Sequence, residues 1–347
     1  MSRFSLNYLG TFLFIIAILS FFNIIYSYYF NLYLNIDTYI YTLFISLMLC
    51  LPLLIKKKEE IKITIYEKIF VVIIGYILLP LIISIPYYLS IYNISFLNCF
   101  FESVSGFTST GFTIFENIKH IDESLILWRS SSQWIGGIYF LFSIILLIDI
   151  FDDNLKKSLT NFISFNSTEI FRQSLKILLL YSALTLFLFI VLKLINIRTF
   201  DSFNLSMTII SSGGFLPFNN IDLIINSDLK KIVFSILMLF SFFSLFLSYN
   251  FFYIKKKNLN FFAEDIYLFM YLTFLIIVFF IFFNFDYNFS SILFSITSSI
   301  SNIGISLNNT PNNLFFLFLI LVIIGGSFFS TSSGIRFLKL YLLIKFS

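Results

Sequence analysis

Long apolar stretches alternate with short polar segments along this chain. Residues 8–26 and 232–247, for example, contain no charged side chain. An α-helix needs roughly 20 such residues to cross the hydrocarbon core of a bilayer, and these stretches approach or exceed that length. The pattern predicts membrane-spanning helices at about residues 6–30, 38–55, 67–90, 125–150, 174–195, 229–253, 266–285 and 314–344.

The order of these helices indicates an internal repeat. After the first two, a spanning helix, a short segment and another spanning helix follow one another three times. We therefore predict an all-α polytopic membrane protein with three helix–pore loop–helix units preceded by two extra transmembrane helices. The predicted parts are residues 1–62 for the two leading helices, and residues 63–157, 158–258 and 259–347 for the three units.

The three short segments can be aligned with one another. They read SVSGFTSTGF (residues 103–112), SMTIISSGGF (206–215) and ITSSISNIGI (296–305). Gly213 competes with Gly214 for the glycine position of the second segment. The shared positions are two hydroxyl columns and one glycine column: Ser105, Thr208 and Ser298; Thr108, Ser211 and Ser301; and Gly111, Gly214 and Gly304.

Each short segment begins with two to three apolar turns, too few to cross a bilayer, and ends in small polar residues. Non-helical backbone at membrane depth is tolerated only where protein buries it or where it lines an aqueous cavity. A half-helix entering from outside directs its negative end inward, and the residues after it can offer carbonyls to a cation. Close helix packing by small residues is the alternative, but three segments in matching positions favour an ion pathway.

The positive charges are grouped at every second boundary. Lysines at 56–58, 156–157 and 255–257 follow apolar stretches, which is the distribution that the positive-inside rule gives to cytoplasmic loops. We therefore expect a multi-pass protein of the cytoplasmic (inner) membrane with its N-terminus in the cytoplasm. The first apolar stretch has no signal-peptide cleavage pattern and is expected to be retained. Nucleic-acid binding would need a solvated basic surface interleaved with aromatics, so no nucleic-acid partner is expected.

Residues that could support enzymatic chemistry are sparse. The chain has one histidine, His120, in a polar segment, and its two cysteines, Cys50 and Cys99, are placed on opposite membrane sides by the predicted topology. A disulfide between them is therefore not expected. A membrane-embedded transferase would need carboxylates or histidines clustered at a membrane face, and we find no such cluster in the sequence. We expect no enzyme.

Four motifs, in order along the chain, resemble those of the Trk/Ktr/HKT superfamily of potassium transporters, most closely the pore-forming subunit of its Trk-type branch. FFESVSGFTSTGF (100–112) and SSGGF (211–215) are similar to the first and second pore loops. ILWRSSSQWIGG (126–137) resembles the opening of the helix after the first loop, and IGGSFFSTSSGIRFLK (324–339) resembles the interrupted helix of the third unit.

The resemblance implies a selectivity filter in which backbone carbonyls bind dehydrated K+, with one glycine in each loop. Gly111 is present where relatives that carry sodium have serine, which favours potassium. The expected filter residues are Thr108, Ser109, Thr110, Gly111, Ser211, Ser212, Gly213, Gly214, Ser301, Asn302, Ile303 and Gly304. A gate below the filter is implied at Gly325, Gly326, Ser327, Ser330, Thr331, Ser332, Ser333 and Gly334.

The resemblance also implies partners: a cytosolic ring of nucleotide-binding regulatory subunits, a second copy forming a homodimer, and membrane lipid. The expected transported ion is K+, and no cofactor is expected on this chain. The family pattern has four pore units, whereas this sequence contains three, so a fourth unit is expected to be absent. The alternative function is therefore a truncated, non-conducting remnant, or an accessory membrane protein that needs another chain to complete the pore.

Three charged residues near these motifs have two interpretations each. Glu102 is expected either to attract cations at the outer mouth or to be a hydrogen-bonded structural carboxylate. Arg129 either anchors the first pore loop or is an ordinary interfacial arginine. For Arg336, membrane topology or snorkelling of the side chain is a sufficient explanation.

Overall fold

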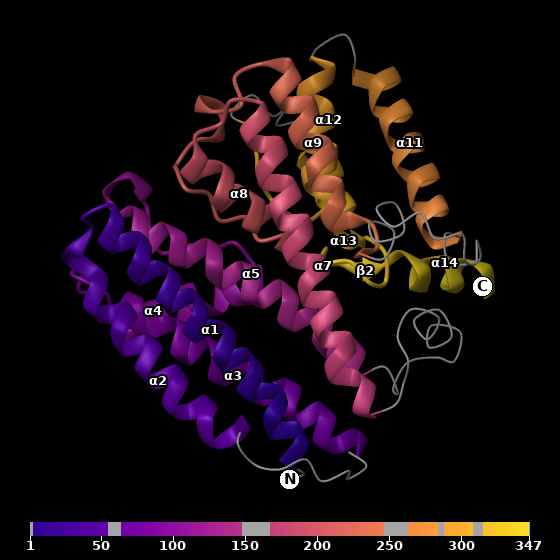
Figure 1. Cartoon of the computed structure of the whole chain (residues 1–347). Coiled ribbons are helices and arrows are strands. Elements are labelled where there is room, and N and C mark those ends of the chain that lie inside the picture. Colours follow the sequence, from indigo (N-terminus) through magenta and orange to yellow (C-terminus); the bar gives the residue numbers. More distant parts are fainter. Residues whose placement is uncertain are drawn as a thin grey trace. The chain divides into compact units, whose positions relative to one another are not determined.

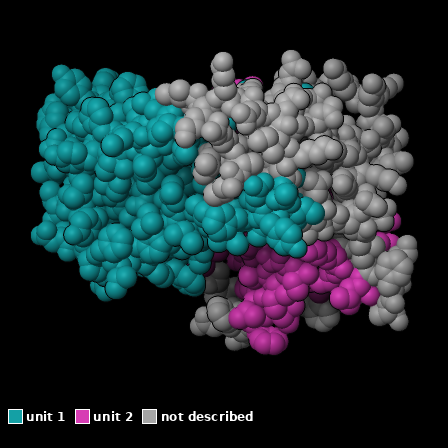
Figure 2. Space-filling view, turned by 90° about the horizontal axis from the view of Figure 1, so that it is seen from below, with its two compact units in different colours: residues 1–176 teal, residues 177–347 magenta. Residues whose placement is uncertain are grey.

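The computed structural model describes residues 3–54, 64–147, 167–245, 263–283, 288–307 and 315–346. The lysine clusters at 56–58, 156–157 and 255–257 lie outside these residues. The chain separates into two compact units, residues 1–176 and 177–347, coloured separately in Figure 2. From here on, the first and second unit are these two compact units, not the predicted helix–pore loop–helix repeats. Each unit is described by itself below.

The first unit consists of helices that pack on one another (Figure 1). The leading helices α1 and α2 pack together, and both pack on α3. We call α4, α8 and α12, the short helices that precede the three expected pore loops, the pore helices. The pore helix α4 lies against α3 and α5. The elements are α1 Arg3–Tyr29, η1 Tyr33–Asn35, α2 Ile36–Leu54, α3 Ile65–Tyr88, α4 Phe96–Phe107, η2 Ile118–His120 and α5 Glu123–Leu146.

In the second unit, two pore helices, α8 and α12, both pack on α9. Helix α7 begins before residue 177 and continues into this unit. The elements are α7 Ser167–Leu194, α8 Thr199–Ser211, η4 Ile221–Leu223, α9 Asp228–Phe242, α11 Ala263–Phe283, α12 Phe289–Ile300, α13 Phe315–Ile323, β1 Ile324–Gly325, β2 Ile335–Arg336 and α14 Phe337–Phe346.

Several helices begin at side chains that cap their first turn. The hydroxyl of Thr64 accepts from the Glu67 amide, and the Glu67 carboxylate accepts from the Thr64 amide, forming a capping box for α3. Asp122 and Ser227 cap α5 and α9 by accepting hydrogen bonds from backbone amides three residues later. Short polar sequences between the apolar stretches therefore fix where the helices start.

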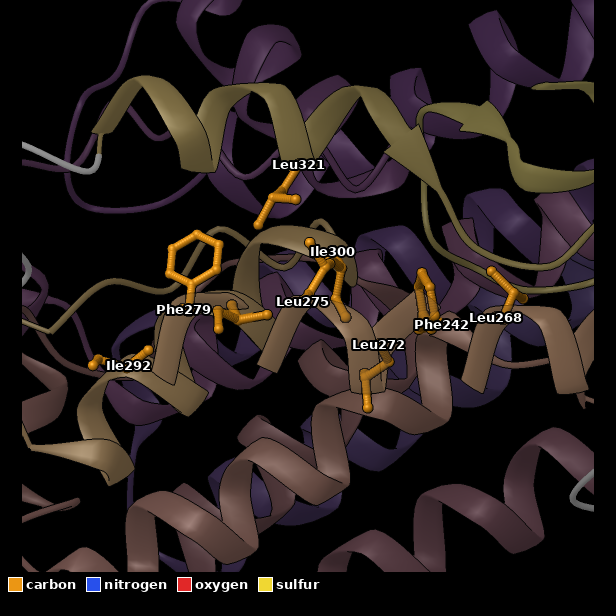
Figure 3. Close-up of a cluster of buried hydrophobic side chains, with 9 residues drawn as sticks. Phe242, Leu268, Leu272, Leu275, Phe279, Ile292, Ile300 and Leu321 are labelled. Carbon is orange, nitrogen blue, oxygen red and sulfur yellow. The ribbon is translucent and has the colours of Figure 1, made fainter. Parts of the chain in front are cut away.

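The core of the second unit is formed by apolar side chains from α9, α11, α12 and α13. In Figure 3, Leu321 extends from α13 toward this cluster, which includes Ile300 at the end of α12. The cluster consists of Phe242, Leu268, Leu272, Leu275, Phe279, Ile292, Ile296, Ile300 and Leu321. These contacts hold the third pore helix against the helices before and after it.

Four helices of the described part are long and apolar enough to cross a membrane: residues 7–29, 33–54, 65–88 and 175–194. Large apolar side chains remain exposed on them, including Phe22 at 59%, Met48 at 78% and Leu179 at 66%. Exposed apolar surface spread along whole helices indicates that lipid, rather than water, surrounds them. Cys50 and Cys99 are both buried free thiols.

The helix predicted over residues 229–253 is interrupted after Phe242, and residues 246–253 lie outside the described part of the chain. The helix ends at Phe242, and Phe243 is extended, with φ −79° and ψ 162°. The amide of Ser327 donates to the Phe242 carbonyl at 3.0 Å, and the amide of Ser332 donates to the Ser241 carbonyl at 3.1 Å. A segment remote in sequence therefore satisfies the carbonyls that another helical turn would have used. Hydropathy gives no sign of this exchange.

The last long apolar stretch is interrupted, as predicted. Helix α13 ends at Ile323 and α14 begins at Phe337, with strands β1 and β2 paired in parallel between them. Ile324 pairs with Ile335, and Gly325 pairs with Arg336. The residues between these pairs form a loop whose two ends meet. Its small residues have low helix propensity, in agreement with the interruption.

Candidate functional site

The three expected filter loops have the same backbone conformation. We call residues 108–111, 211–214 and 301–304 loops 1, 2 and 3. In each loop the second residue and the glycine have positive φ, whereas no other residue of these loops has a positive φ. The values are 54° and 83° for Ser109 and Gly111, 55° and 82° for Ser212 and Gly214, and 59° and 73° for Asn302 and Gly304. Gly214, rather than Gly213, thus occupies the shared glycine position.

Each pore helix ends in a Schellman motif. The amide of Ser109 donates to the Gly106 carbonyl at 3.0 Å, and the amide of Thr110 donates to the Ser105 carbonyl at 2.9 Å. The same pair of bonds closes α8 through Ser212 and Gly213, and α12 through Asn302 and Ile303. This motif needs a left-handed residue just past the helix, which explains the positive φ at residues other than glycine.

The hydroxyl column at Ser105, Thr208 and Ser298 fixes the far side of each loop. Each hydroxyl donates to the carbonyl oxygen seven residues later, which belongs to the residue after the glycine. The distances are 2.5 Å from Ser105 to Phe112, 2.9 Å from Thr208 to Phe215, and 2.6 Å from Ser298 to Ile305. The sequence alignment found these three residues, and their repeated hydrogen bond explains why each is a serine or threonine.

Loop 3 needs glycine at position 304 because of the backbone conformation there, not because a side chain would lack room. A Cβ added to Gly304 would meet no heavy atom within 4 Å, but φ of +73° is a value that residues with a side chain rarely adopt. Gly304 is exposed, and open space adjoins it. The backbone of loop 3 is therefore accessible at Gly304.

Loop 1 is held from the side by helix α5. A Cβ at Gly136 would lie 1.8 Å from the carbonyl oxygen of Phe107, the last residue of α4. Glycine there lets the pore helix end lie directly on α5. About two turns before Gly136 on α5, the guanidinium of Arg129 pairs with the carboxylate of Glu102 on α4. The motif at residues 126–137 thus holds α4 at two points, through an ion pair and through a close backbone contact.

The expected gate residues form one segment, residues 325–334, which we call the gate segment. The Arg336 guanidinium closes it by donating to the Ser327, Ser330 and Ser332 carbonyls and to the Ser330 hydroxyl, at 2.7–3.3 Å. The Glu264 carboxylate accepts from the Phe328 amide at 2.8 Å. Arg336 therefore orders the gate segment. Membrane topology or snorkelling of the side chain, which the sequence suggested, would not need these hydrogen bonds.

The gate segment contacts pore helix α8 and loop 3 of the second unit. Thr331 donates its hydroxyl to the Ile210 carbonyl near the end of α8, at 2.8 Å. Asn302 of loop 3 donates its side-chain amide to the Ser333 carbonyl at 3.2 Å. Loops 2 and 3 and the gate segment thus form one connected set, whereas loop 1 lies in the first unit.

Sequence reasoning missed some contacts of this site. The carbonyls of Ser241 and Phe242 receive the gate segment, and the Asn302 side chain binds it. No sequence pattern points to a backbone carbonyl as a docking point. Asn302 was one of the expected filter residues, but a role was expected only for its backbone carbonyl and none for its side chain. Among the described residues, no cluster of three His, Cys, Asp or Glu side chains could hold a metal ion, and His120 lies exposed at the end of η2.

No protein-family model matches the chain. An uncharacterized cation transporter of Methanocaldococcus jannaschii is 26% identical over 274 residues, covering 76% of this chain and 55% of that protein. The chain therefore spans about half the length of this relative.

Two shorter matches are to Trk system potassium uptake proteins. TrkI of Halomonas elongata is 41% identical over 69 residues, which is 20% of this chain and 13% of TrkI. TrkG of Escherichia coli is 29% identical over 83 residues, which is 24% of this chain and 17% of TrkG. These relatives are named as transporters, not as enzymes.

The crystal structure of the potassium transporter TrkH from Vibrio parahaemolyticus superposes with a TM-score of 0.81, at 22% identity, over 99% of this chain and 75% of that one. The chain thus has the fold of an all-α, multi-pass membrane transporter. The resemblance to the Trk-type branch is confirmed, in sequence by TrkI and TrkG and in fold by TrkH.

Proposed function

We propose that this chain carries K+ into the cell across the cytoplasmic membrane, through a pore lined by the backbone carbonyls of loops 1, 2 and 3. The observation that carries the proposal is the conformation common to the three loops, with positive φ at the same two positions of each. Repeated conformations of this kind suit a filter that replaces the hydration shell of an alkali cation.

Potassium is the preferred ion in this proposal. All three loops keep the glycine, and the relatives named TrkI and TrkG are potassium uptake proteins. The filter residues are those at 108–111, 211–214 and 301–304, and the gate segment controls passage below loops 2 and 3. The hydrogen bonds from Thr331 and Asn302 support this last role, because they connect the gate segment to the end of α8 before loop 2 and to loop 3.

The proposal includes an orientation and partners. The N-terminus lies in the cytoplasm, as the lysine distribution favours. A cytosolic nucleotide-binding ring regulates the gate, and two copies of the chain associate in the membrane. The regulatory ring and the dimer rest on the resemblance to Trk-type proteins. The sequence of this chain has no nucleotide-binding motif of its own.

The test is growth of a potassium-uptake-deficient bacterial host at low K+. The chain is expressed alone and, separately, fused to the portion of TrkH that lies beyond its match to this chain. Rescue in either form, together with Rb+ uptake by the same cells, supports a potassium pathway. Rescue only by the fusion identifies a chain that needs a further segment to conduct.

Gly111→Ser in the rescuing form is the matched control: if uptake passes through the proposed pore, this variant should shift the K+ to Na+ uptake ratio toward sodium. The proposal is wrong if both forms reach the membrane in folded form and neither raises Rb+ uptake above that of the empty host. In that case the chain is an accessory or non-conducting membrane protein.

A further inference from the structure

A buried ion pair lies beside loop 1. Arg129 Nε is 2.8 Å from Glu102 Oε1, and the two side chains are 1% and 0% exposed. Glu102 belongs to pore helix α4, and Arg129 belongs to α5, the helix that follows the loop. The pair therefore joins the pore helix to the next helix of the same unit.

The same two groups hold the chain where it leaves loop 1. The Ile114 amide donates to Glu102 Oε2 at 2.9 Å, and the Thr113 hydroxyl lies 3.0 and 3.1 Å from the two carboxylate oxygens. Arg129 Nη2 donates to Thr113 Oγ1 at 2.9 Å, and its guanidinium carbon lies 5.4 Å from the centroid of the Phe115 ring. The segment just beyond Gly111 is thus fixed to both charged groups.

A pore helix of this kind does not need the carboxylate in order to fold. In the alignment that places Gly111, Gly214 and Gly304 together, Glu102 corresponds to Leu205 and Ser295. Both are buried in their helices, at 0% and 5% exposure. Among the three aligned positions, the carboxylate is therefore found only beside loop 1.

Stability alone is a weak explanation for a buried ion pair. Removing two charges from water is costly, and well-packed apolar residues often serve equally well or better. An outer-mouth role is also weak, because Glu102 is fully buried and its charge is balanced by Arg129. What the pair supplies beyond either role is a set of directed hydrogen bonds to Thr113 and Ile114.

We propose that the Glu102–Arg129 pair positions the Gly111 carbonyl of loop 1 and so determines how well this loop discriminates K+ from Na+. The entrance of the loop is fixed by the Schellman motif at Ser109, and its exit is fixed at Ile114. Between them lies Gly111, the residue with the least conformational restriction of its own. Glu102 and Arg129 are positioning residues that do not touch the ion. The inference rests on the proposed potassium function.

The test uses the double variant Glu102→Leu/Arg129→Met. It removes both charges together, so no buried charge is left unpaired, and leucine is the residue found at the equivalent position 205. The full chain is purified in detergent, and its thermal unfolding is followed in KCl, NaCl and choline chloride, because an ion that binds the folded state raises the unfolding temperature. The ratio of apparent K+ to Na+ affinity should fall about tenfold, or about 1.4 kcal/mol.

Two further variants make the result specific. Trp128→Phe removes the buried hydrogen bond from Trp128 Nε1 to the Ile83 carbonyl, next to Arg129 but directed at α3. It should lower the unfolding temperature without changing the ion ratio. Thr113→Val, at an exposed residue, removes the hydroxyl that both charged groups bind, and the ratio should fall about fivefold.

The outcomes separate the two proposals. A wild-type K+ preference that persists in both the double variant and Thr113→Val would overturn the positioning role and leave the potassium function standing. A ratio lost equally in Trp128→Phe would also overturn it, because any weakening of α5 would then suffice. Absence of any K+ preference in the wild-type chain would overturn the proposed function and this inference with it.

Discussion

Thr331 donates its side-chain hydroxyl to the backbone carbonyl of Ile210 at 2.8 Å, although the two residues are 121 positions apart in sequence. Ile210 lies in the last turn of pore helix α8, directly before loop 2, and Thr331 lies in the gate segment. A change in the gate segment therefore reaches the carbonyl end of the pore helix through a single bond. The gate segment and the end of α8 before loop 2 are therefore directly connected within the second unit.

Replacement of Thr331 by valine should loosen the gate. Valine keeps the branched shape but cannot donate, so the closed arrangement loses about 1 kcal/mol, or about fivefold in the closed-to-open equilibrium. Rb+ uptake in the complementing host should rise accordingly. Thr273→Val is the control, because the Thr273 hydroxyl bonds to the Met270 carbonyl of its own helix α11. Unchanged uptake with Thr331→Val would contradict the role of this bond in closure.

The filter glycines give a second prediction. Gly111 has φ of 83°, a conformation that serine resists, and a serine at this position also adds a side chain to the loop. Gly111→Ser should shift the flux ratio of K+ to Na+ toward sodium. Parallel Rb+ and Na+ uptake measurements would show this. An unchanged ratio in a correctly inserted variant would argue against loop 1 as part of the filter.

Much of this site could be predicted from the sequence because the same residue types recur at equivalent positions of the three loops. Hydroxyls at 105, 208 and 298 recur since each loop needs the same side chain to bind the same carbonyl. The glycine column recurs since each loop needs a positive φ at that position. One sequence thus contains three copies of one geometric requirement, and the copies support one another.

The remainder could not be predicted because it depends on contacts between distant segments. Helix α9 ends early because the backbone amides of Ser327 and Ser332 bond to its last carbonyls. A hydropathy pattern carries no information about such bonds between distant segments. Glu102 and Arg129 were each recognised as candidates, but their pairing and its bond to Ile114 exist only in three dimensions. The role of Arg336 was missed since a basic residue near a predicted membrane boundary has a simpler explanation.

The close contact at Gly136 predicts a different cost for two glycine-to-alanine changes. A Cβ at Gly136 would lie 1.8 Å from the Phe107 carbonyl oxygen, so the backbone of α4 must move. We expect destabilisation of about 1–3 kcal/mol, typical of overpacking. Gly10→Ala is the control: its Cβ would meet only side-chain atoms at 3.1–3.3 Å, and the gain in helix propensity compensates.

Denaturant or thermal unfolding of the two purified variants would measure the difference. Equal stability would mean that α4 can move away from α5 without loss, contrary to the close packing of these two helices. An ion preference that declines with Gly136→Ala but not with Gly10→Ala would further connect this contact to loop 1.

Arg336 provides the last prediction. Its guanidinium donates four hydrogen bonds to the gate segment, three to carbonyls and one to the Ser330 hydroxyl. Arg336→Gln keeps a polar side chain but cannot span these acceptors, since it lacks the five-donor planar fork of arginine. Backbone amides of residues 325–334 should then exchange with deuterium faster, because exchange reports local opening.

Lys339→Gln is the matched control for Arg336→Gln, since Lys339 is an exposed cation on the same helix, α14. It should leave exchange in the gate segment unchanged while altering the charge by the same amount. Faster exchange with both variants would indicate that net charge near this end of the chain, rather than the four directed bonds, orders the segment. Faster exchange with Arg336→Gln alone, accompanied by higher basal Rb+ uptake, would identify the guanidinium as the group that holds the gate segment closed.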